Sequence, residues 1–182
     1  MPEIDSTLLA VMVSLILLGH GVFGLVKPDK LAGFLRNYSR NIIAGYITMV
    51  IGTVWFIVIL ENENLADFGV YKTKMQIFFG VLGIGAIYYL KDYLAVRGTA
   101  ILLMLMAKLV IETIRLEDTD WRIPFIAFAY IWIISGIVFT VSPWRFRDLA
   151  NWKYANTGRT KNVCAASTVV GVIMLVVGLS AF

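Results

Sequence analysis

Residues 7–26 read TLLAVMVSLILLGHGVFGLV, a stretch that contains no Asp, Glu, Lys or Arg. A helix needs about 20 mostly apolar residues to cross the hydrocarbon core of a bilayer. Five more apolar stretches follow, and a closed β-barrel is excluded because its alternating pattern is missing. We therefore predict six membrane-spanning helices, at 7–26, 42–60, 76–90, 98–115, 123–141 and 163–182.

The composition supports the same class of protein. Of the 182 residues, 59% are hydrophobic and 15% are charged. Soluble domains contain about 45–50% apolar and about 25% charged residues, so a soluble or disordered chain is excluded. We expect an all-α integral membrane protein in which residues 1–182 form a single transmembrane helical domain.

The charges predict how the spans are oriented. Every second connecting segment is basic, namely 27–41, 91–97 and 142–162, whereas Glu3, Asp67 and most other acidic residues fall on the opposite side. The positive-inside rule then places the three basic loops in the cytoplasm and both termini outside. The net charge of +4 follows from this orientation, so we expect no nucleic-acid partner. No targeting extension is evident, which favours a prokaryotic plasma membrane.

Two of the basic loops predict amphipathic helices that lie in the headgroup plane. Apolar side chains recur at helical spacing from Leu31 to Tyr38, and basic side chains take the other faces. The third basic loop mixes aromatic and basic residues in a similar way, and Tyr154 is expected there as an interfacial anchor. The residues expected to contact lipid headgroups or a partner are Lys30, Arg36, Arg40, Trp144, Arg145, Arg147, Trp152 and Lys153.

Two similar stretches, one in each half of the chain, indicate an internal repeat. Residues 21–30, GVFGLVKPDK, align without a gap with residues 136–145, GIVFTVSPWR. We interpret 7–60 and 123–182 as two parallel copies of one hairpin, an arrangement known from transporters. The alternative is that any span followed by a basic loop produces this pattern.

Ionisable side chains within the spans are candidates for a functional site, because burying them in lipid is costly. Lys108 lies near the middle of the span at 98–115, and Glu112 and Arg115 follow it on the same helix face. Three roles are open for this group: structural pairing or snorkelling, anchoring of a partner subunit or lipid, and an ion or proton path.

His20 is the sole histidine, and Cys164 is the sole cysteine. These counts exclude a disulfide within the chain and zinc sites built from Cys and His. His20 is a weak candidate for binding a haem together with Met49, Met104 or Met106, or a chlorophyll alone. A hydrogen bond across a helix interface is its ordinary role. Bound lipids are the cofactors we expect.

Small residues predict close helix packing. Ala10, Ser14 and Gly21 share one stripe of the first span, and Gly171 and Gly178 lie one heptad apart in the sixth. Three glycines within 80–85 predict a third span that is thin or flexible. The sharper alternative for that span is a broken helix at a substrate site.

Catalytic motifs are missing from the sequence, which argues against an enzyme. The first functional hypothesis is a non-catalytic accessory or assembly subunit of a larger membrane complex, of a respiratory or photosynthetic kind. The second is a small transporter or channel that uses Lys108 and Glu112. A lipid- or quinone-modifying enzyme ranks third. Its partners would be membrane lipids together with other membrane subunits or a second copy of the chain.

Overall fold

The computed structural model describes residues 5–182, apart from the side chain of Asp67. Glu3 and that side chain lie outside the described part, so their expected place on the acidic side is untested. The chain is 85% helical and the described residues form no strand, which confirms the all-α class. Five helices are long and apolar enough to cross a membrane: α1 (Ser6–Val26), α3 (Ile42–Asn62), α5 (Leu94–Ile114), α6 (Arg122–Val141) and α8 (Thr157–Ser180).

The third predicted span forms α4 (Lys72–Tyr89), an unbroken helix that follows the 3₁₀ turn η1 (Ala66–Tyr71). The alternative of a broken helix in this span is therefore wrong. However, α4 is not among the five helices that meet the length and hydropathy requirement. Its first turns explain this, because Lys72, Lys74 and Gln76 make its beginning polar.

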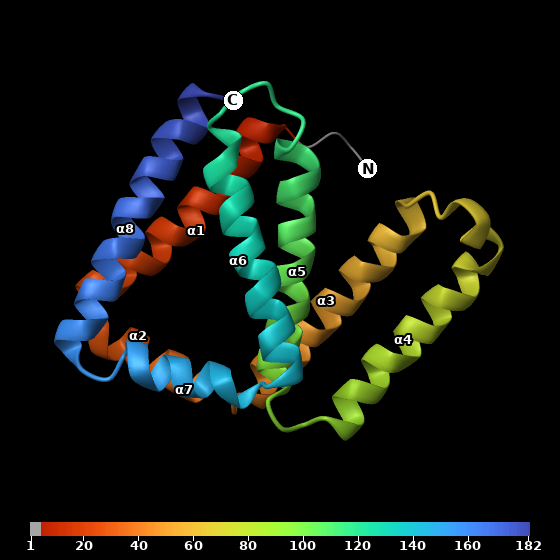
Figure 1. The fold of residues 1–182 in the computed structure, drawn as a ribbon. Coiled ribbons are helices and arrows are strands. Elements are labelled where there is room, and N and C mark those ends of the chain that lie inside the picture. Colours follow the sequence, from red (N-terminus) through yellow and green to blue (C-terminus); the bar gives the residue numbers. More distant parts are fainter. Residues whose placement is uncertain (1–4) are drawn as a thin grey trace.

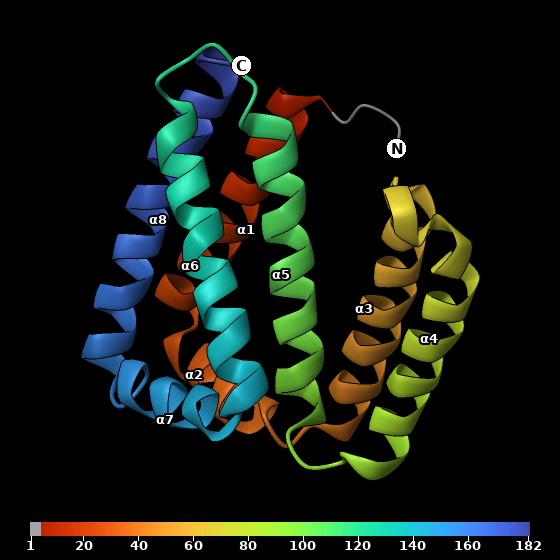
Figure 2. The same ribbon diagram turned by 45° about the vertical axis from the view of Figure 1, so that its right-hand side comes forward.

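Both predicted amphipathic segments are helical. They form α2 (Pro28–Tyr38), which begins with its proline, and α7 (Trp144–Lys153). Proline is favoured at a first helical turn because no intrahelical partner for its missing N–H exists there. Figures 1 and 2 show α2 and α7 lying crosswise at one end of the bundle, where the link from α4 to α5 also lies. We call this the basic end, and the end that carries η1 and the C-terminus the opposite end.

The long helices form two groups. Helices α1, α5, α6 and α8 enclose a core near the opposite end that includes Leu9, Val110 and Phe125. Helix α3 packs along α5 and carries α4 on its other side, so the α3–α4 pair stands beside the main bundle (Figure 2). As a result, α4 is the least buried long helix, and Gly83 is its one buried residue.

The predicted packing faces of the first and last spans are confirmed, because α1 and α8 lie against each other along their length. A methyl group added at Gly21 would overlap Thr168, and one at Gly171 would overlap Leu18. Gly178 lies against Ala10, which is fully buried. The small side chains let the two backbones approach closely, and the resulting van der Waals packing stabilises helix association in lipid.

The two ends of the proposed repeat share an order of elements: α1, α2 and α3 correspond to α6, α7 and α8. Within each unit, the predicted interfacial helix lies between the two long helices. Helix α1 packs along α8, whereas α3 packs along α5. A common origin of 7–60 and 123–182 stays a prediction, but the units are not simple hairpins.

Candidate functional site

Lys108 lies toward the opposite end of α5, not at its middle. The helix begins at Leu94, earlier than the predicted 98, so Lys108 falls in its last third. Its ammonium group forms ion pairs with Glu112, one turn further along α5, and with Glu63, which directly follows α3. The expected pairing with Glu112 is present, and Glu63 is an additional partner.

This cluster carries a net charge of −1, since two carboxylates surround one ammonium group. The side chain of Lys108 is 32% exposed, and those of Glu63 and Glu112 are 43% and 50% exposed. Arg115 follows the end of α5 and is exposed, and it takes part in no ion pair of the described residues. The cluster therefore joins α3 to α5 without Arg115.

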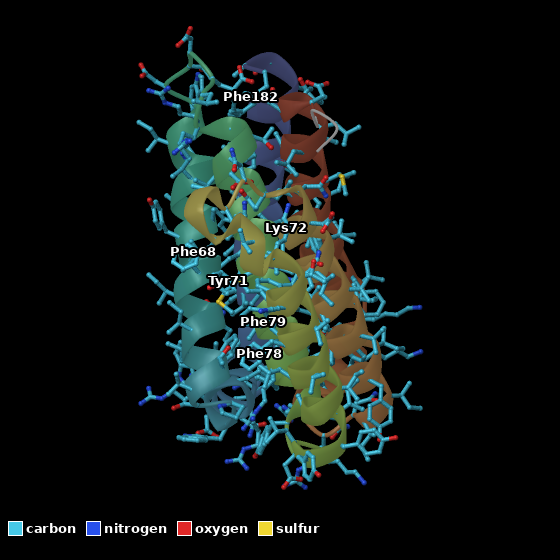
Figure 3. The ribbon with its side chains drawn as sticks, turned by 90° about the vertical axis from the view of Figure 1, so that its right-hand side faces the viewer. Phe68, Tyr71, Lys72, Phe78, Phe79 and Phe182 are labelled. Carbon is cyan, nitrogen blue, oxygen red and sulfur yellow. The ribbon has the colours of Figure 1, made fainter. Side chains whose placement is uncertain are left out.

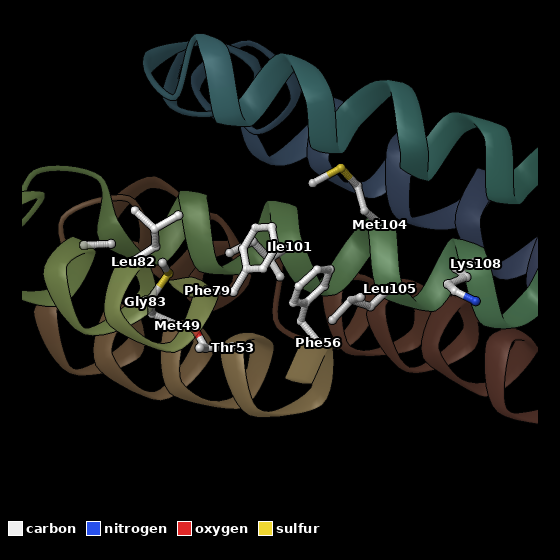
Figure 4. Close-up of a pocket in the computed structure, with 11 residues that line it drawn as sticks. Met49, Thr53, Phe56, Phe79, Leu82, Gly83, Ile101, Met104, Leu105 and Lys108 are labelled. Carbon is white, nitrogen blue, oxygen red and sulfur yellow. The ribbon is translucent and has the colours of Figure 1, made fainter. Parts of the chain in front are cut away.

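An apolar groove of about 480 Å³ runs between α4 and α5, with α3 as its floor. Each helix contributes a stripe at helical spacing (Figure 4): Met49, Thr53 and Phe56 from α3; Phe79, Leu82, Gly83 and Ala86 from α4; Ile101, Met104, Leu105 and Lys108 from α5. Lys108 stands at one end of the groove and is its sole ionisable lining residue. Such a groove fits an apolar chain or helix that has a polar group at one end.

The outer surface of α4 is also apolar. Figure 3 looks onto this helix, on which Phe78 and Phe79 are labelled. Phe78 is 58% exposed, and Ile77, Val81 and Ile84 are exposed as well. From Ile77 onward α4 is apolar on nearly every side, which is typical of a segment surrounded by lipid or by a partner helix.

His20 lies at the basic end and fulfils the ordinary role expected of it. Its Nε2 atom is 2.9 Å from the hydroxyl oxygen of Tyr154, which follows α7. Tyr154 is only 6% exposed, so the prediction that it is an interfacial anchor is wrong. Burial, and to a smaller extent the negative charge that Cys164 gains at alkaline pH, raises the pKa of Tyr154 to about 12, so its hydroxyl stays protonated at neutral pH.

A haem held by His20 together with Met49 or Met104 finds no support in this geometry. Met49 and Met104 line the apolar groove, whereas His20 lines a separate cavity and its Nε2 is already engaged by Tyr154. No group of three or more His, Cys, Asp or Glu side chains in the described residues is placed to hold a metal ion.

The cavity beside His20 has a volume of about 230 Å³ and lies between α1, α2, α5, α6 and α7. Its polar lining consists of His20, Ser135, Lys153 and Tyr154, and Trp132, Phe139 and Phe146 supply aromatic surface. Its lining includes no carboxylate. A mostly apolar cavity with a few converging polar groups is typical of a small-ligand site.

The predicted interface residues divide into three sets. Arg36 donates to the backbone carbonyl of Tyr154, and Arg147 Nη1 donates to the Tyr93 hydroxyl over 3.1 Å, so both hold the basic end together. Lys153 lines the cavity. The others are exposed and available to headgroups or a partner: Lys30, Arg40, Trp144, Arg145 and Trp152.

Sequence reasoning missed Glu63, Ser135 and Trp132, and it gave Tyr154 the wrong role. The roles of Glu63 and Tyr154 depend on contacts between distant parts of the chain: Glu63 and Lys108 are 45 residues apart, and His20 and Tyr154 are 134 apart. Ser135 and Trp132 become relevant only where the fold assembles the cavity that they line. The position of Ser135 inside a span was the one available signal, since polar side chains there often bond across helices.

Comparison of the chain with protein-family models, curated proteins and solved structures gives no match.

Proposed function

We propose that this protein is a non-catalytic subunit of a larger membrane complex and that a transmembrane helix of its partner lies in the groove between α4 and α5. The observation that carries this proposal is the groove itself, whose three stripes recur at the spacing with which a helix would pack. Gly83 and Ala86 have small side chains on the α4 side of the groove, so the partner helix can approach the α4 backbone closely.

The weak attachment of α4 supports the same role. This helix packs along α3, makes no comparable contact with α5, and buries a single residue. A partner helix in the groove would touch α3, α4 and α5 at once and would fix α4 in place. Lys108, Glu63 and Glu112 at its end would select a partner with a polar or cationic side chain at that depth.

The proposal includes the topology. We infer that α4 crosses the membrane as a sixth span, that the basic end is cytoplasmic, and that both termini are outside, in a prokaryotic plasma membrane. The supporting observation is that α2, α7 and the α4–α5 link share one end of the bundle (Figures 1 and 2).

The test is the size of the particle that contains the protein after extraction from its native membrane in mild detergent. We expect co-migration with other polypeptides, far above the 20.4 kDa of the chain. Ala86→Leu would fill the groove and release the protein from its partner. Gly85→Leu is the matched control, because this neighbouring glycine has open space around it. A wild-type protein that runs alone would contradict the proposal.

The competing proposal is a small transporter in which Lys108 lies on the transport path. It is favoured by one observation, that Lys108 lines the groove while binding carboxylates from two helices. A cysteine placed at position 108 separates the two proposals. Reaction with water-soluble thiol reagents from both sides of the membrane would favour transport, and reaction from one side or neither would exclude it.

A further inference from the structure

The cavity beside His20 contains hydrogen-bond donors that no other group in the described chain satisfies. Lys153 is half-buried, and it forms none of the ion pairs of the described residues. Ser135 also lacks a hydrogen-bond partner, although Thr140 on the same helix donates to the carbonyl of Gly136 over 2.8 Å. Because neither side chain has a hydrogen-bond partner among the described residues, both can donate to a ligand that enters the cavity, and such bonds would add to its affinity.

The charge of the cavity selects an anion. Lys153 contributes a positive charge, and no acidic side chain lines the wall to neutralise it. The volume of about 230 Å³ is smaller than the roughly 300–1,000 Å³ of sites for drug-sized ligands. The cavity therefore suits one charged group of a larger molecule, and a phosphate matches several donors because its oxygens accept in different directions.

The surroundings show where the rest of that molecule would lie. Phe139 and Leu149 line both this cavity and a cleft on the outer face of α6 and α7. Trp144, Arg145, Asp148 and Trp152 line the cleft at the basic end, and the carboxylate of Asp148 is paired with Arg147 over 3.1 Å. From there, exposed apolar side chains continue along α6, the surface that acyl chains would cover: Tyr130, Ile131, Ile134, Ile137, Val138 and Val141.

We infer that the cavity between α1, α6 and α7 binds the phosphate of an anionic phospholipid, whose acyl chains lie along α6. Lys153 supplies the positive charge, Ser135 donates to a phosphate oxygen, and Trp144 and Trp152 hold the glycerol region at the interface. The site does not depend on the proposed role as a subunit, since it lies at the other end of the molecule from Lys108.

The test is lipid binding to the purified full-length chain in detergent, followed by native mass spectrometry and by the shift of its unfolding temperature. The probes are dioleoylphosphatidylglycerol, dioleoylphosphatidylcholine and inorganic phosphate. We expect one tightly held phosphatidylglycerol per chain and weaker binding of phosphatidylcholine. Lys153→Met should bind phosphatidylglycerol about tenfold more weakly, as expected for loss of one charged hydrogen bond.

Two further variants keep the result interpretable. Ser135→Ala leaves the charge unchanged and should also weaken binding, whereas Lys161→Met removes an exposed charge on α8 and should not. Unchanged affinity in Lys153→Met, or equal losses in Lys153→Met and Lys161→Met, would overturn the site. If inorganic phosphate stabilises the protein as strongly as phosphatidylglycerol, the phosphate site stands and its assignment to a lipid is overturned.

Discussion

The hydrogen bond between His20 and Tyr154 ties α1 to the segment between α7 and α8. Tyr154→Phe keeps the ring in its cluster with Leu31 and Ala150 but removes the partner of His20. We expect the free energy of unfolding to fall by about 1 kcal/mol, the usual scale for one such bond. Thermal unfolding in detergent measures this loss. Tyr89→Phe, at a tyrosine that is 88% exposed, should change nothing. Equal losses in both variants would contradict a specific role for the bond.

Tyr154 also predicts a dependence on alkaline pH. In the folded chain, burial, followed by the Cys164 thiolate, raises its pKa from the ordinary value of 10.0 to about 12. Between these two pH values, Tyr154 has lost its proton in the unfolded chain but retains it in the folded chain. The contribution of Tyr154 to the free energy of unfolding is therefore lost as pH rises through this window. Below pH 10.0 the contribution is constant.

Ultraviolet absorbance of tyrosinate during an alkaline titration tests this prediction. In the wild type, part of the tyrosinate absorbance should appear only near the upper end of this pH range. Tyr154→Phe should not show this late component. A late component that persists in Tyr154→Phe belongs to another tyrosine and would refute the assignment.

At the scale of elements, the close contact of α1 with α8 predicts opposite effects for two neighbouring glycines. Gly21→Ala places a methyl group against the backbone and side chain of Thr168, so the two helices must separate. Overpacking of this kind costs about 1–3 kcal/mol. Gly19→Ala meets open space and should be neutral or stabilising by about 0.5–1 kcal/mol, because alanine favours a helix. Unfolding temperatures of the two variants provide the comparison, and a reversed order would show that α1 and α8 do not pack this way.

The helices could be predicted from the sequence because each is long, apolar and bounded by local signals. The glycine stripes even identified which faces of the first and last spans are buried. The ends were less accurate: α8 begins at Thr157 because the side chain of Asn156 accepts from the backbone of Arg159 over 2.8 Å, a cap that hydropathy does not register. The order of packing was also beyond local reasoning, since α2 and α7 separate helices that are adjacent in sequence.

The candidate sites could be predicted only in part, because their residues come together through the packing of helices across the whole molecule. Lys108, Glu112 and His20 stand out in a sequence because charged or polar groups are rare inside apolar spans. Their partners Glu63 and Tyr154 lie in segments where polar residues are ordinary. The fold brings these groups together across the bundle, and only the packing of α3 on α5, and of the α7–α8 link on α1, identifies the pairs.

The path of the whole chain through the membrane depends on α4, and single cysteines can trace it. The native Cys164 is fully buried and should stay unlabelled. If α4 crosses, Asn64→Cys and Asp118→Cys should react in intact cells with a thiol reagent that cannot enter, whereas Asn37→Cys and Asp92→Cys should react only after permeabilisation. If α4 does not cross, the cysteine at position 92 should react in intact cells, as the one at position 64 does. The cysteine at position 118 should then react only after permeabilisation. The basic α7 would then face outward, against the positive-inside rule, and the α4–α5 link could not share an end with α2.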